Sequence, residues 1–245
     1  MDGRTPSRGQ RSDQPWQLLT SPATAALTKR SGRWLLGLAG PPGVGKSTVS
    51  AALVSACTAA GRSAAVVAMD GFHLSAAELE AAGLVDVKGA PETFDATGFV
   101  RLLEQLRTNE AAVVHAPAFD RDRERAVPAA IAVPHETELV VVEGNYLLLD
   151  GPWRPVRKLL DEVWFLDLPA EVRVPRLIAR HRAHGRSAEE AAEWVHRSDE
   201  TNTARVLATR AHADAFVDVA TGDVTYAPPP GAGRTDPAGQ QPRRR

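Results

Sequence analysis

Short apolar runs alternate along the chain with segments whose apolar residues recur at helical spacing. Runs of this length are typical of buried strands, and they occupy residues 34–39, 64–69, 112–115, 139–142, 163–168 and 215–219. Helical spacing and two capping-box pairs, Ser75–Glu78 and Ser187–Glu190, predict helices over 46–60, from 75, over 99–106, and from 187 towards Arg210. Because strands alternate with helices, we predict an α/β fold with a parallel sheet and helices on both of its faces.

The overall charge of the chain is close to zero, with 29 Lys and Arg against 30 Asp and Glu. This balance argues against a generally basic nucleic-acid-binding protein. The single cysteine, Cys57, excludes an intramolecular disulfide and a Cys-rich metal site, and we expect it to be buried and inert. No apolar run approaches the roughly 18 residues of a membrane helix, and residues 1–16 lack the apolar region of a secretory signal. We therefore expect a cytoplasmic protein with no nucleic-acid and no membrane partner.

Both ends of the chain differ in composition from its centre. Residues 1–15 are rich in Pro, Gly, Ser and Arg, and residues 227–245 are rich in Pro and Gly and end in three arginines. Neither segment is periodic, so we expect disordered tails, the second a solvated basic one. No repeat of solenoid length is present. Residues 16–226 are predicted to form a single domain.

Residues 40–48 read GPPGVGKST, which fills every fixed position of the phosphate-binding loop G-x-x-x-x-G-K-[ST]. Glycines allow successive backbone N–H groups to turn towards phosphate oxygens, and the following helix adds the positive end of its dipole. Lys46 supplies a cation for the β- and γ-phosphates, and the Ser47 hydroxyl can hold Mg²⁺. We predict that a nucleoside triphosphate is bound by Gly40, Pro41, Pro42, Gly43, Val44, Gly45, Lys46, Ser47 and Thr48.

Two carboxylates follow apolar strands directly, Asp70 after 64–69 and Glu143 after 139–142. In a parallel sheet they would lie at the same end as the phosphate loop. In a phosphotransferase, one acid accepts the proton of the acceptor hydroxyl while another organises Mg²⁺. Spacing alone leaves the two roles unassigned.

Four further motifs follow the phosphate loop in order, and together with it they carry a resemblance. They are MDGFHL at 69–74, KGAPETFD at 88–95, PAFDR at 117–121 and VVVEGNY at 140–146. The pattern over residues 33–220 resembles the phosphoribulokinase/uridine kinase family of P-loop kinases, and most of all its nucleoside/nucleotide kinase-like and fructose-transport-system kinase-like group. The 88–95 segment is also similar to type I pantothenate kinases.

The resemblance implies a P-loop NTPase fold with an arginine-bearing helical lid. It makes Asp70 the general base and places Glu143 near Mg²⁺. It also implies an acceptor side lined by Phe72, His73, Lys88, Glu92, Phe94, Asp95, Asp120 and Arg121. The residues alone leave open whether His73 contacts the acceptor or is a packed histidine.

A basic helix and the turn after it, residues 176–186, occupy the place of the lid in the resembling family. The forked guanidinium of arginine suits charge that is spread over several phosphate oxygens. The resemblance therefore implies phosphate contacts for Arg176 and Arg180, more than for Arg182 and Arg186. The resemblance also implies that residues 209–214 lie beside the adenine of ATP. We do not expect His181, His184 or His196 to bind metal, because Mg²⁺ takes oxygen ligands.

Two functions of different classes fit these observations. The first is an ATP-dependent kinase that phosphorylates a hydroxyl of a small metabolite, with a nucleoside the first expected acceptor and pantothenate or a sugar next. The second is a nucleotide-gated regulator, for which we would expect a base-specificity element such as Asn-Lys-x-Asp, and the sequence has none. The sequence leaves open whether the chain forms a homo-oligomer, and Trp153, Trp164 and Trp194 are predicted to be core or interface anchors.

Overall fold

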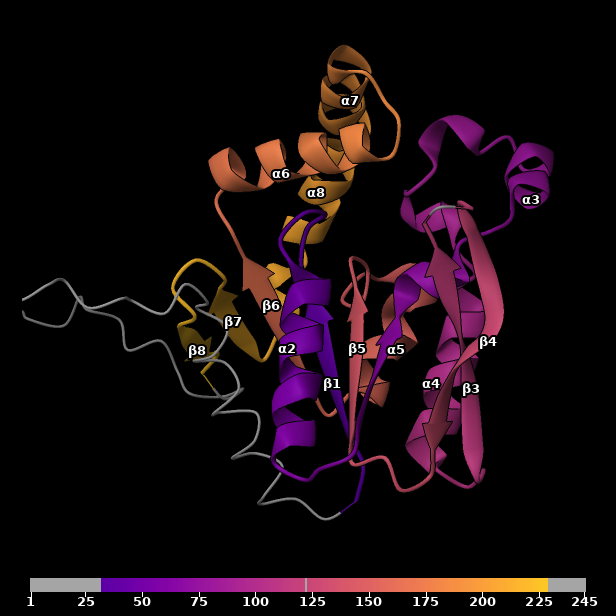
Figure 1. Cartoon of the computed structure of the whole chain (residues 1–245), viewed down its shortest axis with the longest axis vertical. Helices are drawn as coiled ribbons and strands as arrows, with labels where there is room; N and C mark the ends of the chain where they lie inside the picture. The colour runs from indigo at the N-terminus through magenta and orange to yellow at the C-terminus, as the bar shows by residue number, and fades with distance from the viewer. Residues whose placement is uncertain (1–31, 122, 229–245) are drawn as a thin grey trace, which may run out of the picture.

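A six-stranded sheet forms the centre of the computed structural model, which describes residues 32–121 and 123–228 (Figure 1). Its strand order is β2-β5-β1-β6-β7-β8, and every pair is parallel except β7 with β8. The strands are β1 Trp34–Ala39, β2 Ala64–Ala68, β5 Leu139–Gly144, β6 Glu162–Asp167, β7 Ala215–Asp218 and β8 Val224–Tyr226. The predicted α/β fold is confirmed.

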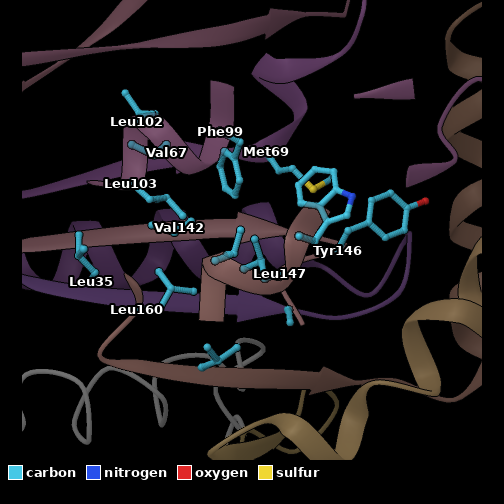
Figure 2. Packing of buried hydrophobic residues seen from close by; sticks show 14 of the residues in the cluster. Leu35, Val67, Met69, Phe99, Leu102, Leu103, Val142, Tyr146, Leu147 and Leu160 are labelled. Atoms are coloured by element: carbon cyan, nitrogen blue, oxygen red, sulfur yellow. The ribbon is translucent and has the colours of Figure 1, made fainter. Parts of the chain in front are cut away.

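Successive residues of β1 point to opposite faces of the sheet, and both faces are buried. On one face, Trp34, Leu36 and Leu38 pack with the helix α2 (Lys46–Ala59), whose Cys57 is buried as expected. On the other face, Leu35 packs with residues of α4 (Ala96–Thr108) and α5 (Arg154–Leu159). Figure 2 shows Phe99, Leu102 and Leu103 of α4 on the same side of the sheet as Met69, Val142 and Tyr146. Continuous apolar runs are expected for strands that are covered on both faces.

The expectation that the strand at 112–115 joins the parallel sheet was wrong. It belongs to β3 (Val113–Asp120), which pairs antiparallel with β4 (Arg125–Pro134) in a separate two-stranded ribbon. The pairing shifts register between Ala116 and Ala118, around Pro117. β4 carries two prolines and half of its residues are exposed, as an edge strand tolerates, and the prolines interrupt an otherwise apolar sequence. The run at 64–69 is also shorter than predicted, because Met69 begins a 3-10 turn, Met69–Phe72.

Two groups of helices stand above the carboxyl ends of the parallel strands (Figure 1). On one side is α3 (Ala76–Ala81), and on the other are α6 (Ala170–Ala183), α7 (Ala188–Trp194) and α8 (Glu200–Leu207). Both predicted capping boxes are present, at the starts of α3 and α7. The helix predicted from residue 187 runs through α7 and α8, with a π-helical turn at Val195–Asp199 between them.

The tails predicted at 1–15 and 227–245 lie outside the described residues, apart from 227 and 228, as does the 16–31 part of the predicted domain. Trp153 and Trp164 are buried in the core, as predicted. None of the helices in the described part of the chain combines the length and the apolar character that spanning a membrane requires.

The α4 face of the core gives a test of the packing. Phe99 is fully buried, with its ring 5.1 Å from that of Phe72 and 5.9 Å from that of Trp153. Removing the ring loses the burial of an aromatic side chain and leaves a cavity, so Phe99→Ala should lower the free energy of unfolding by about 3–5 kcal/mol. Urea denaturation measures this loss. The exposed Arg101→Ala on the same helix is the control and should change stability by less than about 0.5 kcal/mol; equal effects of the two variants would contradict the packing.

Candidate active site

The phosphate loop connects the end of β1 to the start of α2. Gly43 and Gly45 have φ of 77° and 104°, in the left-handed region that favours glycine. A Cβ on Gly43 would come within 2.6 Å of the Leu177 side chain, because α6 packs directly on the loop. The Val44 side chain lies in the core, so only its backbone can face a ligand.

Lys46 extends from the first turn of α2 into a ring of oxygen atoms. Its Nζ donates to Gly40 O at 2.9 Å, to Pro41 O at 3.1 Å and to Asn145 Oδ1 at 2.6 Å. Burial lowers the pKa of Lys46 to about 8, although Glu143 and Asp70 oppose the lowering. Asn145 was not predicted as a site residue; its position directly after β5, two residues from Glu143, was the available signal.

Glu143 lies at the end of β5 and faces the phosphate loop. One carboxylate oxygen accepts from the Ser47 hydroxyl at 2.9 Å and the other from the Ser50 hydroxyl at 3.0 Å. Burial raises the pKa of Glu143, while Lys46 and the two serines oppose the rise. The oxygen atoms of Glu143 and Ser47 fit Mg²⁺, which is commonly held by one or two protein oxygens together with phosphates and waters. Ser50 is a further residue that sequence analysis did not assign.

Asp70 is held at the mouth of the cleft by contacts from three directions. The Arg121 guanidinium, at the end of β3, donates to Asp70 Oδ2 at 3.1 Å. His73 Nδ1 lies 2.8 Å from the Asp70 backbone oxygen. A Cβ on Gly71 would come within 2.5 Å of Pro117 O, so the turn lies tightly against β3. This turn directs the Asp70 side chain into the same cleft as Lys46.

His73 forms part of an aromatic wall opposite the lid. Its ring centre is 4.0 Å from that of Phe94 and 4.6 Å from that of Phe119. Burial lowers the pKa of His73, with Asp70 opposing the change. Lys88 donates to Glu124 at 2.5 Å beside these rings. We call the following six residues the acceptor wall: His73, Lys88, Phe94, Phe119, Arg121 and Glu124.

Four residues of the predicted acceptor side make structural contacts outside the cleft. Phe72 packs against Phe99 in the core, and Asp95 caps α4 by accepting from Gly98 N–H. Glu92 pairs with Arg205 at a separate, smaller cavity. Asp120 accepts from the backbone N–H and the guanidinium of Arg123. We leave Phe72, Glu92, Asp95 and Asp120 out of the site proposed below.

The lid helices close the other side of the cleft, which has a volume of about 920 Å³. Arg176 and Arg180 of α6 line it. Arg180 is open to the solvent of the cleft, yet the enclosing protein lowers its pKa; Arg121 adds to the lowering, and Asp199 and Asp70 oppose it. Arg173, absent from the predicted site, is buried and donates to Pro42 O at 3.3 Å, so it ties α6 to the phosphate loop.

Residues 209–214, which were predicted to lie beside the adenine of ATP, contact β6 and β7 of the sheet. Arg210 pairs with Asp167 at 2.6 Å and covers the ring of Phe216. Asp214 accepts from Val163 N–H at 2.8 Å. Within residues 32–121 and 123–228, no cluster of three or more His, Cys, Asp or Glu side chains could hold a metal ion.

A glycine-rich loop between a parallel strand and a helix, with a lysine, a serine and a strand-end acid around it, defines a P-loop nucleotide-binding site. Residues 35–225 match the phosphoribulokinase/uridine kinase family, and the chain belongs to this family. It is a P-loop kinase, as the sequence motifs predicted.

Relatives carry several kinase names. A Schizosaccharomyces pombe protein provisionally named a uridine kinase is 38% identical over 188 residues, which is 72% of this chain and 79% of the relative. A crystal structure of a provisionally named fructose transport system kinase from Silicibacter sp. TM1040 is 38% identical, with a TM-score of 0.72 over 78% of this chain and 95% of the other. A pantothenate kinase of Halalkalibacterium halodurans is 35% identical over 49% of this chain and 38% of its own length.

The lowered pKa of Lys46 predicts a pH dependence of nucleotide binding. The ammonium form binds phosphate, and above a pKa of about 8 its population falls about tenfold for each pH unit. The affinity for Mg·ATP should therefore be about tenfold weaker at pH 9 than at pH 7, measured by isothermal titration calorimetry. Lys46→Arg stays charged throughout this range and should show a flat profile; an equally flat wild-type profile would contradict the prediction.

Proposed function

We propose that the protein transfers the γ-phosphate of ATP to a hydroxyl group of an uncharged small metabolite, with a nucleoside as the first candidate. The proposal depends on one observation above all. The Asp70 carboxylate shares a cleft with Lys46 and the phosphate loop, and the Arg121 guanidinium of the acceptor wall donates to it at 3.1 Å.

The chemistry follows from these positions. The acceptor oxygen forms a bond to the γ-phosphorus while the bond from that phosphorus to the bridging β–γ oxygen breaks, and its electron pair leaves with ADP. Asp70 accepts the proton of the acceptor hydroxyl; its role is mainly to position that hydroxyl, since the transition state is loose. Lys46, Arg176 and Arg180 stabilise the charge on the phosphate oxygens. Ser47 and Glu143 would hold Mg²⁺, which would neutralise part of the charge of the phosphates.

The charges of the acceptor wall support an uncharged acceptor. Its two cations are both paired, Arg121 with Asp70 and Lys88 with Glu124. An acceptor carrying a carboxylate or a phosphate would compete with these two carboxylates for the cations. His73 and its flanking rings offer a flat apolar surface, which suits the base of a nucleoside. A sugar is the second candidate and pantothenate, which is anionic, the third; relatives named for uridine, fructose transport and pantothenate agree with this set.

The regulator hypothesis makes a different prediction. A nucleotide-gated switch binds ATP without an acceptor, and it needs neither a general base nor an aromatic acceptor wall. Stimulation of ADP release by a small molecule therefore separates the two functions.

The test measures ADP release from Mg·ATP with uridine, cytidine, fructose, pantothenate, ribulose 5-phosphate and pyridoxal. One uncharged compound should stimulate release. Asp70→Asn should lower kcat by about 10²-fold or more, because a general base contributes about 10²–10⁴-fold, while the Kd for Mg·ATP changes less than about threefold.

Asp86→Asn, an exposed carboxylate outside the cleft, is the matched control and should keep wild-type kcat. Full activity of Asp70→Asn would refute its role as the base. Tight ATP binding with no stimulation by any compound would favour the regulator.

A further inference from the structure

A histidine and an aspartate in the lid face the cleft but have no part in the phosphate transfer described above. His181 Nε2 of α6 lies 2.8 Å from Asp199 Oδ2, and their side chains are only 18% and 12% exposed. Both line the cleft. Asp199 comes from the π-helical turn Val195–Asp199. The two elements that carry them are separated by a turn and by α7, so the pair forms only in the folded lid.

The π-helical turn changes the direction in which Asp199 points. Each residue of an α-helix advances the side-chain direction by about 100°, and a π turn inserts one extra residue into that pattern. Such turns are often found at functional sites. Without the insertion, the side chains after it would be rotated away from their present directions. The turn therefore aims a carboxylate into the cleft at the junction of α7 and α8.

Asp199 lines the same cleft as Arg180 and the acceptor wall. It is close enough to Arg180 to oppose the lowering of that residue's pKa. Burial raises the pKa of Tyr146, and Asp199 adds to the rise. The Tyr146 hydroxyl donates to Gly89 O at 2.5 Å, in the segment that carries Lys88 of the acceptor wall.

The chemistry of this pair selects its ligand. A carboxylate repels the triphosphate of ATP, so Asp199 suits a donor group instead. His181 contacts Oδ2, which leaves Oδ1 to accept from a ligand. Beside the pair, the half-buried Trp194 lines the cleft, with the Arg186 guanidinium 4.0 Å from its ring centre. A carboxylate next to an indole suits a compound that has hydroxyl groups on a sugar ring.

We infer that Asp199, oriented by His181, binds a second hydroxyl group of the acceptor, one that is not phosphorylated. The acceptor is accordingly a polyhydroxylated compound, a sugar or a sugar-containing molecule such as a nucleoside. This inference rests on the proposed function, because it takes the bound compound to be the phosphate acceptor. The binding of a hydroxylated compound by Asp199 can be measured without any phosphate transfer.

The experiment changes the protein and the probe separately and together, and compares the binding affinities of the four combinations. Isothermal titration calorimetry measures uridine, 2′-deoxyuridine, 3′-deoxyuridine, D-fructose and 1-deoxy-D-fructose, with AMP-PNP and Mg²⁺ present. The wild type should bind one hydroxylated probe at least tenfold more tightly than its deoxy partner, because a site built for a hydroxyl rejects the analogue that lacks it. In Asp199→Asn that ratio should fall below about twofold, while the Kd for AMP-PNP changes less than twofold.

Two further variants distinguish recognition of the probe by Asp199 from a purely structural role of the Asp199–His181 pair in the lid. His181→Gln should reduce the same ratio partially, since it disturbs only the orientation of Asp199. Glu193→Gln removes an exposed carboxylate of α7 that lies outside the cleft, and it should keep the wild-type ratio.

The inference is overturned if Asp199→Asn keeps the wild-type ratio, if it weakens AMP-PNP and the probe equally, or if the wild type binds none of the hydroxylated probes. Failure of the proposed function looks different. In that case the wild type discriminates between probe and deoxy partner and Asp199→Asn does not, yet no probe is phosphorylated when ATP replaces AMP-PNP.

Discussion

The electrostatic pairing of Lys46 with Glu143 is the constraint on which the site depends. The register of β1 with β5 sets Leu38 opposite Glu143 and Ala39 opposite Gly144, so the phosphate loop and the strand-end acid emerge side by side. Each charge is partly desolvated, which disfavours it, and each stabilises the other. Asn145 and Ser50 complete the hydrogen bonds of the two groups. A slip in that register would move Glu143 and Asn145 away from Lys46 and the two serines.

The cleft is assembled from parts that are distant in sequence. The acceptor wall comes from the turn after β2, the segment before α4 and the β3–β4 ribbon, while the other side comes from α6 to α8. The buried Arg173 connects the lid to the loop through Pro42 O and to α8 through Glu200. Because one buried guanidinium contacts both elements, the position of the lid is coupled to the conformation of the phosphate loop.

The two sides of the cleft differ in charge, and this difference gives each a separate task. On the acceptor wall the cations are paired with carboxylates, whereas Arg176 and Arg180 of the lid line the cleft with no ion pair to a carboxylate among the contacts described. Unpaired arginines suit the phosphates of ATP, and a neutral aromatic wall suits an uncharged acceptor. Asp199 and His181 are the exception on the lid side, which is why they point to the acceptor and not to the nucleotide.

The sequence alone determined the phosphate loop, the α/β order of elements and the two strand-end acids, because each depends on neighbouring residues and on local periodicity. Tertiary structure decided the rest. Asn145 reaches Lys46 across 99 positions, and Arg173 reaches Pro42 across 131. The β3–β4 ribbon escaped prediction because two prolines interrupt the apolar sequence of β4 and half of its residues are exposed. Phe72 and Asp95 belong to sequence motifs of the family, yet core packing and helix capping direct their side chains away from the cleft. Asp199 lines the cleft from a π turn, which no periodicity in the sequence indicates.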